Sequence, residues 1–422
     1  MLFSRLGPFG SARASAVALA TILSSPALSA PMLTLDDAVL AAGGTAPANA
    51  AAAAGVEAAA AGRTVAGLRP NPVFQGQIEN IIGSGPFRGL QSAETTFGVA
   101  VPIELGGKRG ARVAVAGAQL SRAQLQAVIA AADVRLEITQ LYVEAVAADR
   151  RLLTARDQAR IAADALRGAG VRVRAGRASP LEEQRAEVAR INADANVERL
   201  THLAKATRTN LARRIGREVD GPLDAGFLDR LPAATFGPTQ PTPLAGTLAL
   251  AAADADLAIA DAGIRLARAN RVPDLNIGPA VRRLEATKDT AAVFAISIPI
   301  PVFSNGRAAI AQASAERNRV AAVRRVTALD VGQAITNAEV AAANAAISAR
   351  AAAGPALAAA QEAARIARIG YREGKFSQLE LLDAERTLAE TRVAAIDALA
   401  NYQIARARFE RLKAPAPDKQ GS

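Results

Sequence analysis

Hydrophobic and polar residues alternate with a period of two in four short segments, which form two pairs along the chain. These segments are residues 73–82, 95–103, 274–284 and 291–300. In the second segment Phe97, Val99 and Val101 share one face, and small or polar residues occupy the other. This pattern is typical of β-strands, and about ten residues is the length that a tilted strand needs to cross an outer membrane. The sequence predicts two β-hairpins, either in an outer membrane or in a soluble domain.

Helical periodicity fills most of the remaining chain. The long tracts span residues 112–168, 180–214, 308–354 and 357–412, and shorter helices are expected at 46–68 and 245–269. In the last long tract Leu381, Leu388 and Ala395 recur with heptad spacing, and smaller residues lie between them. Such spacing predicts a narrow coiled-coil seam. A helix of about 50 residues would be about 75 Å long, which favours a tube over a globule.

The two halves of the chain repeat each other in one register. The matched pairs are Gly176 with Gly374, Ser179 with Ser377, and Glu182 with Glu380. We therefore predict two structural repeats, at residues 31–220 and 244–412, each with a strand pair and a long helix pair. The proline-rich residues 221–243 are expected to link the repeats, with a short helix at 223–231, and residues 413–422 to form a disordered tail.

The first residues resemble a secretory signal. Arg5 and Arg13 precede an apolar run at 14–23, and small residues follow up to Ala30. This layout predicts a signal peptide at residues 1–30, with a short buried helix as the alternative. Beyond it there is no strongly apolar run of about 18 residues or more, so no transmembrane helix is expected.

Composition narrows the possible functions of the 422-residue chain. Hydrophobic residues make up 50% but aromatic residues only 3%, which favours closely packed, alanine-rich helices. With no Cys and one His, disulfides, thiolate sites and multi-histidine metal sites are excluded. The formal net charge is +11, but the basic residues alternate with acidic ones and lack stacking aromatics, which argues against nucleic-acid binding.

No sequence motif indicates an enzyme. Nucleophile-elbow, phosphate-loop and dinucleotide-binding patterns are missing, and the single histidine, His202, has no obvious partner. We expect His202 to be structural or exposed. The sequence predicts a protein that is not an enzyme and needs no cofactor and no bound metal.

Four strands cannot close a membrane barrel alone, because lipid does not tolerate open sheet edges and the smallest such barrels have about eight strands. Two copies would supply eight strands and a lumen filled by side chains. Three copies would supply twelve strands and an aqueous pore. The polar faces of the predicted strands favour three copies.

The chain resembles the TolC family of outer-membrane efflux factors. The resemblance rests on the duplicated order of strands and helices, the Leu-Arg-Pro-Asn-Pro segment 68–72, and the turns around Gly176 and Gly374. Residues 101–109, Val-Pro-Ile-Glu-Leu-Gly-Gly-Lys-Arg, look like the heavy-metal branch, the cobalt, zinc and cadmium resistance type. The resemblance covers nearly the whole chain after the predicted signal peptide.

This resemblance implies a mainly α fold with a small β part. Three chains would form an α-helical barrel of long coiled-coil helices, continuous with a 12-stranded outer-membrane β-barrel that takes four strands from each chain. The location would be the outer membrane of a Gram-negative bacterium, with the helices in the periplasm. The implied partners are a periplasmic adaptor, an inner-membrane pump of the resistance-nodulation-division type, and outer-membrane lipid.

The resemblance also assigns roles at the two helix turns. Tyr371 matches a gate-linking tyrosine of the family, and Glu380 and Asp383 match acidic ring positions, with Glu182 as the counterpart in the first half. Phe376 departs from the family, since an arginine there takes part in the closed-state link. The alternative is that these acids only keep the tip hydrated.

The same turns are the expected adaptor-docking tips. The residues concerned are Gly176, Ser179, Gly374 and Ser377. Two functions therefore remain: a passive efflux conduit, or a periplasmic coiled-coil scaffold or adaptor whose strands form a soluble domain. The sequence leaves open whether the cargo is a metal or an organic compound, which pump and adaptor take part, and whether the gate is open or closed.

Overall fold

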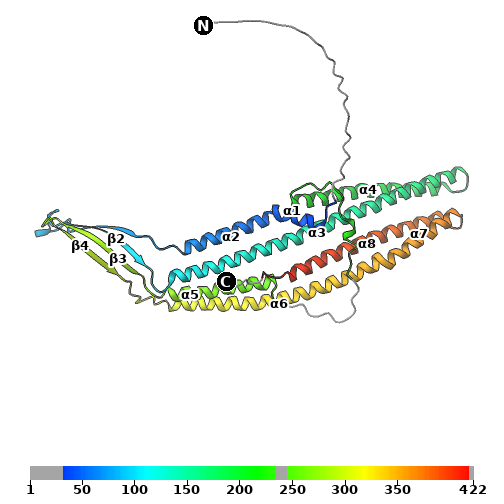
Figure 1. Ribbon diagram of the computed structural model, residues 1–422. Coiled ribbons are helices and arrows are strands. Elements are labelled where there is room, and N and C mark those ends of the chain that lie inside the picture. Colours follow the sequence, from blue (N-terminus) through cyan, green and yellow to red (C-terminus); the bar gives the residue numbers. More distant parts are fainter. Residues whose placement is uncertain (1–31, 233–244, 418–422) are drawn as a thin grey trace, which may run out of the picture.

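In the computed structural model the chain is a long rod of helices with a small sheet at one end (Figure 1). The structure describes residues 32–232 and 245–417. The predicted signal peptide at residues 1–30 and residues 233–243 of the predicted linker lie outside these ranges.

Four strands form one antiparallel sheet in the order β1-β2-β3-β4. They are β1 (Val73–Glu79), β2 (Glu94–Ile103), β3 (Leu275–Leu284) and β4 (Thr290–Ser297). The four predicted segments are confirmed, but β1 and β4 end early. Asn80 has a φ of 59°, which leaves the extended region directly after β1. β4 ends before Pro299, which has no backbone N–H to donate to a neighbouring strand.

The two faces of the sheet differ in polarity. On one face Phe97 of β2 lies opposite Val281 of β3 and stacks on Phe74 of β1, with 6.0 Å between the ring centroids. On the other face Arg282 donates to the Thr96 hydroxyl at 3.0 Å and to Glu94 at 2.7 Å. The apolar face is uncovered in a single chain, with Phe74 70% and Ile296 of β4 63% exposed.

Eight α-helices lie within the described residues. They are α1 (Leu35–Thr45), α2 (Pro47–Ala66), α3 (Lys108–Arg174), α4 (Pro180–Ile215), α5 (Leu248–Ala269), α6 (Arg307–Ala351), α7 (Leu357–Arg372) and α8 (Gln378–Lys413). The long tracts are confirmed, except that the tract predicted at 357–412 is divided into α7 and α8 by the turn at residues 373–377. The sequence reading missed α1, although Thr34 and Asp37 form a capping box that marks its start.

The helices pack side by side along the rod. α2 and α5 contact α3 near the sheet, and farther along α4 and α8 contact α3 (Figure 1). α3 alone has 67 residues, which corresponds to about 100 Å. The α3–α4 and α7–α8 hairpins turn at the end of the rod opposite the sheet (Figure 1). None of the helices in the described parts of the chain combines the length and the apolar composition that crossing a membrane requires.

Residues 101–109 form the elbow where the sheet passes into α3. Lys108 Nζ lies 2.7 Å from Asp274 Oδ1, just before β3, and the Leu105 N–H donates to the same oxygen at 3.1 Å. Arg109 Nε donates to the Gly67 carbonyl at 2.5 Å, at the end of α2. The motif that resembles the heavy-metal branch thus ties β2, β3 and α2 to the start of α3.

α6 passes into α7 through one irregular turn. Residues Ala352–Ala356 form a π-helical turn that contains Pro355. Proline has no N–H to donate and its ring crowds the preceding turn, so the regular α-helical hydrogen bonds are interrupted here. The predicted break between residues 354 and 357 is confirmed.

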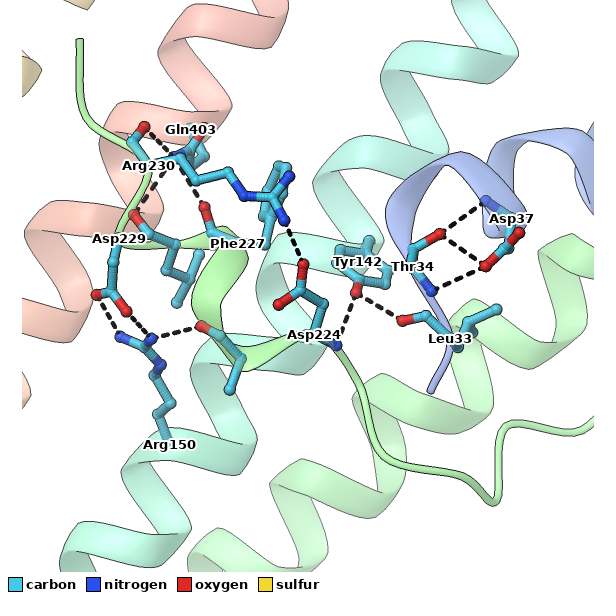
Figure 2. Close-up of polar contacts among 12 residues, drawn as sticks. Leu33, Thr34, Asp37, Tyr142, Arg150, Asp224, Phe227, Asp229, Arg230 and Gln403 are labelled. Atoms are coloured by element: carbon cyan, nitrogen blue, oxygen red, sulfur yellow. Dashed lines mark hydrogen bonds and ion pairs between the residues drawn. The ribbon is translucent and has the colours of Figure 1, made fainter. Parts of the chain in front are cut away.

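Polar contacts hold the segment after α4 against the middle of the rod (Figure 2). The buried Tyr142 hydroxyl of α3 donates to the Leu33 carbonyl at 2.8 Å and accepts from the Asp224 N–H at 3.0 Å. Burial raises the pKa of Tyr142 to about 12. Gln403 Nε2 of α8 donates to three carbonyls of this segment, those of Phe227, Leu228 and Arg230.

Two expectations about the connecting segments were wrong. The helix predicted at 223–231 is a single 3₁₀ turn, Ala225–Phe227, followed by carbonyls that accept from the Gln403 side chain. The predicted tail at 413–422 is ordered through residue 417. Leu248 N–H donates to the Ala414 carbonyl at 3.1 Å, and Ala416 N–H donates to the Gly246 carbonyl at 2.7 Å. Residues 418–422 lie outside the described ranges.

The buried part of the α8 heptad seam is shorter than predicted. Leu388, Ala395 and Tyr402 are buried, whereas Leu381 and Phe409 are only half-buried. The seam is therefore tightest in the middle of the rod and loosens toward both of its ends.

Candidate gate at the helical tips

Each helix hairpin turns through a glycine. Gly176 and Gly374 have φ values of 68° and 73°, in the left-handed region that glycine adopts without strain. A Cβ added to either residue would meet nothing within 4 Å. The two predicted docking turns are therefore open to their surroundings in this chain.

The serines that follow the glycines begin the returning helices. The Ser179 side chain accepts from the Leu181 N–H at 3.3 Å at the start of α4. Ser377 forms a full capping box with Glu380: its N–H donates to Glu380 Oε2 at 2.6 Å, and Glu380 N–H donates to Ser377 Oγ at 3.3 Å. The Ser377 backbone N–H, and then its side chain, lower the pKa of Glu380 below its ordinary value of 4.5.

The matching acid of the first half has a different partner. Glu182 lies at the equivalent position in α4 but faces Arg172 of α3, with 3.9 Å between Oε2 and the guanidinium Nη1. The two acids are equivalent in the sequence repeat, yet one caps its own helix and the other reaches across to the preceding one.

Arg172 also joins the two hairpins. Its Nη1 donates to the Tyr371 hydroxyl of α7 at 3.1 Å, and its guanidinium carbon lies 5.4 Å from the Tyr371 ring centroid. The hydrogen bond to Tyr371 raises the pKa of Arg172. We call Arg172, Tyr371 and Glu182 the tip clasp, since these residues connect α3, α4 and α7.

The structure thus brings Tyr371 and Glu182 together through Arg172, which the sequence analysis did not single out. The second half has Gly370 at the position equivalent to Arg172, so the repeat gave no sign of it. The available signal was a long, positively charged side chain close to the repeated turn. Its partner, however, depends on how the two hairpins pack.

Phe376 packs on α7 within its own hairpin, although 38% of it is exposed. A Cβ on Gly370 would stand 2.3 Å from Phe376 Cδ2, so the ring packs directly on the glycine backbone. An apolar ring cannot donate a hydrogen bond as the expected arginine would. The guanidinium that bonds Tyr371 comes from Arg172 on the α3–α4 hairpin.

Asp383 lies on the solvent-exposed surface of α8. Its Oδ1 is 3.4 Å from the Arg386 guanidinium, and both side chains are mostly exposed. Because Glu380 and Asp383 are three residues apart, they lie on neighbouring positions of one helix face. Each chain therefore presents two carboxylates near its tip.

An ion pair with a buried carboxylate lies deeper in the second hairpin. Arg368 of α7 pairs with Glu385 of α8, whose side chain is 3% exposed. Gln158 of α3 donates to the Glu385 carbonyl at 3.4 Å. The sequence analysis did not single out Glu385, although its place beside the heptad seam pointed to burial.

Metal ligands are not gathered at the tip or elsewhere in residues 32–232 and 245–417, where no cluster of three or more His, Cys, Asp and Glu side chains could hold an ion. His202 is exposed on α4. At the tip, helix caps stabilise the start of α8, and the hydrogen bond from Arg172 to Tyr371 joins the two hairpins.

Comparison with known proteins identifies the family to which the chain belongs. The model of the family described as outer membrane efflux protein matches residues 42–217 and 243–413, which cover most of both predicted repeats. The chain belongs to the outer membrane efflux protein family. The resemblance to TolC-type channels found in the sequence is thereby confirmed.

Relatives within the outer membrane efflux proteins include two metal-resistance proteins from Cupriavidus metallidurans. The chain is 28% identical over 386 residues to the cobalt-zinc-cadmium resistance protein CzcC, covering 90% of both chains. It is 30% identical over 283 residues to the nickel and cobalt resistance protein CnrC, covering 66% of this chain and 67% of that one. The expected heavy-metal branch is confirmed.

The fold is also shared with a solved membrane protein from Pseudomonas aeruginosa. The two structures agree with a TM-score of 0.75 at 21% identity, covering 92% of each chain. A mainly helical chain with a small four-stranded sheet is therefore the fold of this family member, as the sequence predicted.

Proposed function

We propose that this chain is the outer-membrane channel of a tripartite efflux pump. Three copies form a passive conduit that exports divalent heavy-metal cations from the periplasm or the pump to the outside. The observation that carries the proposal is the similarity to CzcC along 90% of both chains. An adaptor and an inner-membrane pump of the resistance-nodulation-division type supply the energy, since the channel has no chemistry of its own.

The sheet supports an assembly in the outer membrane. β1 and β4 are the two edge strands of the described sheet, and each presents unpaired backbone groups. Lipid cannot satisfy those groups, so β4 of one copy must pair with β1 of the next. Three copies give the 12-stranded barrel, with the Phe74 and Phe97 face toward lipid and the Arg282 face toward the lumen.

The runner-up function, a periplasmic scaffold or adaptor, fits the sheet poorly. A soluble sheet buries its apolar face against other elements, whereas here Phe74 and Ile296 are 70% and 63% exposed. In the proposed arrangement residues 1–30 direct export, residues 31–220 and 244–412 form the two repeats, and the helical tips lie in the periplasm.

At the tips we propose that Glu380 and Asp383 each form a ring of three carboxylates. Two stacked acidic rings at a narrow entrance raise the local concentration of cations and repel anions. Tyr371 and Glu182 belong to the gate through the tip clasp, and the turns at Gly176, Ser179, Gly374 and Ser377 receive the adaptor. A binding preference for divalent cations at the entrance would suit a metal-exporting channel.

The rings predict a cation-selective channel. We expect the purified protein to run as a trimer in detergent and to conduct cations in preference to anions in planar bilayers. The double variant Glu380→Gln with Asp383→Asn is expected to lose most of this preference while remaining trimeric. Glutamine at 380 can still cap α8, so the substitution tests charge and not helix stability.

The pH response depends on the charge of Glu380. The cap lowers the pKa of Glu380, whereas repulsion between neighbouring ring carboxylates would raise it. The cation preference is therefore expected to weaken as the pH falls through the carboxylate range. Unchanged selectivity in the double variant would contradict the rings and favour acids that merely hydrate the tip. A wild-type protein that is monomeric and does not conduct would contradict the channel itself.

A further inference from the structure

Three charged side chains from three strands meet on the polar face of the sheet. Arg282 Nη1 of β3 donates to Glu94 Oε2 of β2 at 2.7 Å, and Arg282 Nη2 lies 3.3 Å from Glu79 Oε2 of β1. Arg282 Nε also donates to the Thr96 hydroxyl at 3.0 Å. We call Glu79, Glu94 and Arg282 the sheet triad. Two carboxylates and one guanidinium give the triad a net charge of −1 in each chain.

The rest of this face carries no charge along the four described strands. Gln75 and Gln77 are the other polar side chains that β1 presents here, and β4 contains no charged residue. The remaining charged residue of the strands is Arg283, which lies opposite Thr95 on the other face because side chains alternate along a strand. The charges of the polar face are therefore confined to one narrow band.

This band lies at the end of the sheet that points away from the helices. Glu79 is the last residue of β1 and Glu94 is the first of β2, and the connection between these strands lies at that end (Figure 1). The three side chains are between 26% and 39% exposed in the single chain. In the proposed barrel the polar face lines the lumen, so three chains would place three triads around the exit, with a net charge of −3.

The balance of charge in such a band decides how long a cation stays there. A channel conducts only if ions bind favourably enough to enter and weakly enough to leave. Without Arg282 the same band would hold six carboxylates with no positive charge between them. Attraction for a divalent cation grows with the charge that surrounds it, so this band would retain metal ions at the exit.

We propose that Arg282 sets the release of cations at the channel exit, and this inference rests on the proposed channel function. Its guanidinium offsets one of the two carboxylates in each chain. The band then favours cations over anions but does not retain divalent ones. Arg282 is thus a residue that determines ion specificity at the opposite end of the conduit from the acidic tips.

The test uses two substitutions that break the same contact but change the charge in opposite directions. Arg282→Gln makes the band more negative, whereas Glu94→Gln makes it neutral. Co²⁺ would be added on the side of the strand connections while single reconstituted trimers conduct potassium. We expect Co²⁺ to block the current at about tenfold lower concentration in Arg282→Gln than in the wild type, and only at higher concentration in Glu94→Gln.

The neighbouring Arg283 supplies the matched control. It pairs with Glu285 at 3.3 Å on the other face, so Arg283→Gln makes the same change of charge outside the lumen and should leave the block unchanged. Arg282→Lys keeps the charge and should behave as the wild type does. An unchanged block in Arg282→Gln would overturn the role. A shift in the same direction in Arg282→Gln and Glu94→Gln would also overturn it, because that result reports damage to the sheet.

A second measurement does not need conduction. The chain has no Cys, so Gln77→Cys introduces a single thiol in the row that Thr96 and Arg282 share. On intact cells this thiol should react faster with a cationic thiosulfonate reagent than with an anionic one, relative to a free thiol in solution. Adding Arg282→Gln should raise this preference about fivefold.

An equal preference with and without Arg282→Gln would contradict the inference, as would a thiol at residue 77 that reacts with neither reagent. These outcomes leave the channel function standing if trimers conduct. If wild-type trimers conduct no ions, the proposed function is contradicted, and the thiol comparison still decides whether Arg282 controls the charge of this face.

Discussion

Replacing Arg172 by glutamate is expected to raise the open fraction of the reconstituted channel by about tenfold or more. The substitution removes the 3.1 Å hydrogen bond to Tyr371 and the contact with its ring. It also places a carboxylate against Glu182, where the wild-type pair is 3.9 Å apart. Loss of the charge-assisted hydrogen bond to Tyr371 disfavours the clasped state by about 1 kcal/mol or more, whereas the contact with Glu182 lies within the α3–α4 hairpin.

The control for this prediction is Arg177→Glu. Arg177 lies in the exposed turn of the same hairpin, so the change in charge is identical but the clasp stays intact. Single-channel recordings of the two variants separate the clasp from a general effect of charge at the entrance. Equal open fractions in both variants would show that Arg172 does not hold the gate.

Filling the two tip turns is expected to abolish efflux. In the double variant Gly176→Trp with Gly374→Trp, large side chains would project from turns where a Cβ meets nothing within 4 Å. They would block an adaptor that approaches the turns and leave the interior of the rod undisturbed. In cells that supply the adaptor and pump, we expect metal efflux to fall to the level of cells without the channel.

The matched control is Gly176→Ala with Gly374→Ala. Alanine shares the strain of a non-glycine residue at positive φ, which is about 1 kcal/mol at each turn, but adds little bulk. Efflux in the alanine variant should stay near the wild-type level. Normal efflux in the tryptophan variant, with trimers present in the outer membrane, would refute docking at the turns.

Local patterns were enough to predict most of the fold. The alternation around Phe97 marks a strand because the two faces of the sheet meet different surroundings, and the repeat placed both hairpins in one register. Strand ends were less predictable, since a single positive φ at Asn80 ends β1 three residues early. α1 was missed even though the Thr34–Asp37 capping box is visible in the sequence, because its alanines and glycines show little periodicity.

The site was predicted only in part, for a physical reason. Tyr371, Glu182 and Glu380 were found from the repeat and the resemblance, and Ser377 with Glu380 has the spacing of a capping box. Arg172 was missed because its partner lies on the other hairpin, and contacts between distant segments leave no local pattern.

Metal export from living cells tests the central claim most directly. Cells that have a matching adaptor and pump but lack their outer-membrane channel would be loaded with cobalt, zinc or cadmium, and their metal content followed by mass spectrometry with and without this protein. The account predicts that the protein restores loss of metal from the cells, and that the wild-type trimer is found in the outer membrane. Undiminished metal content, despite outer-membrane trimers and a functional adaptor and pump, would contradict it.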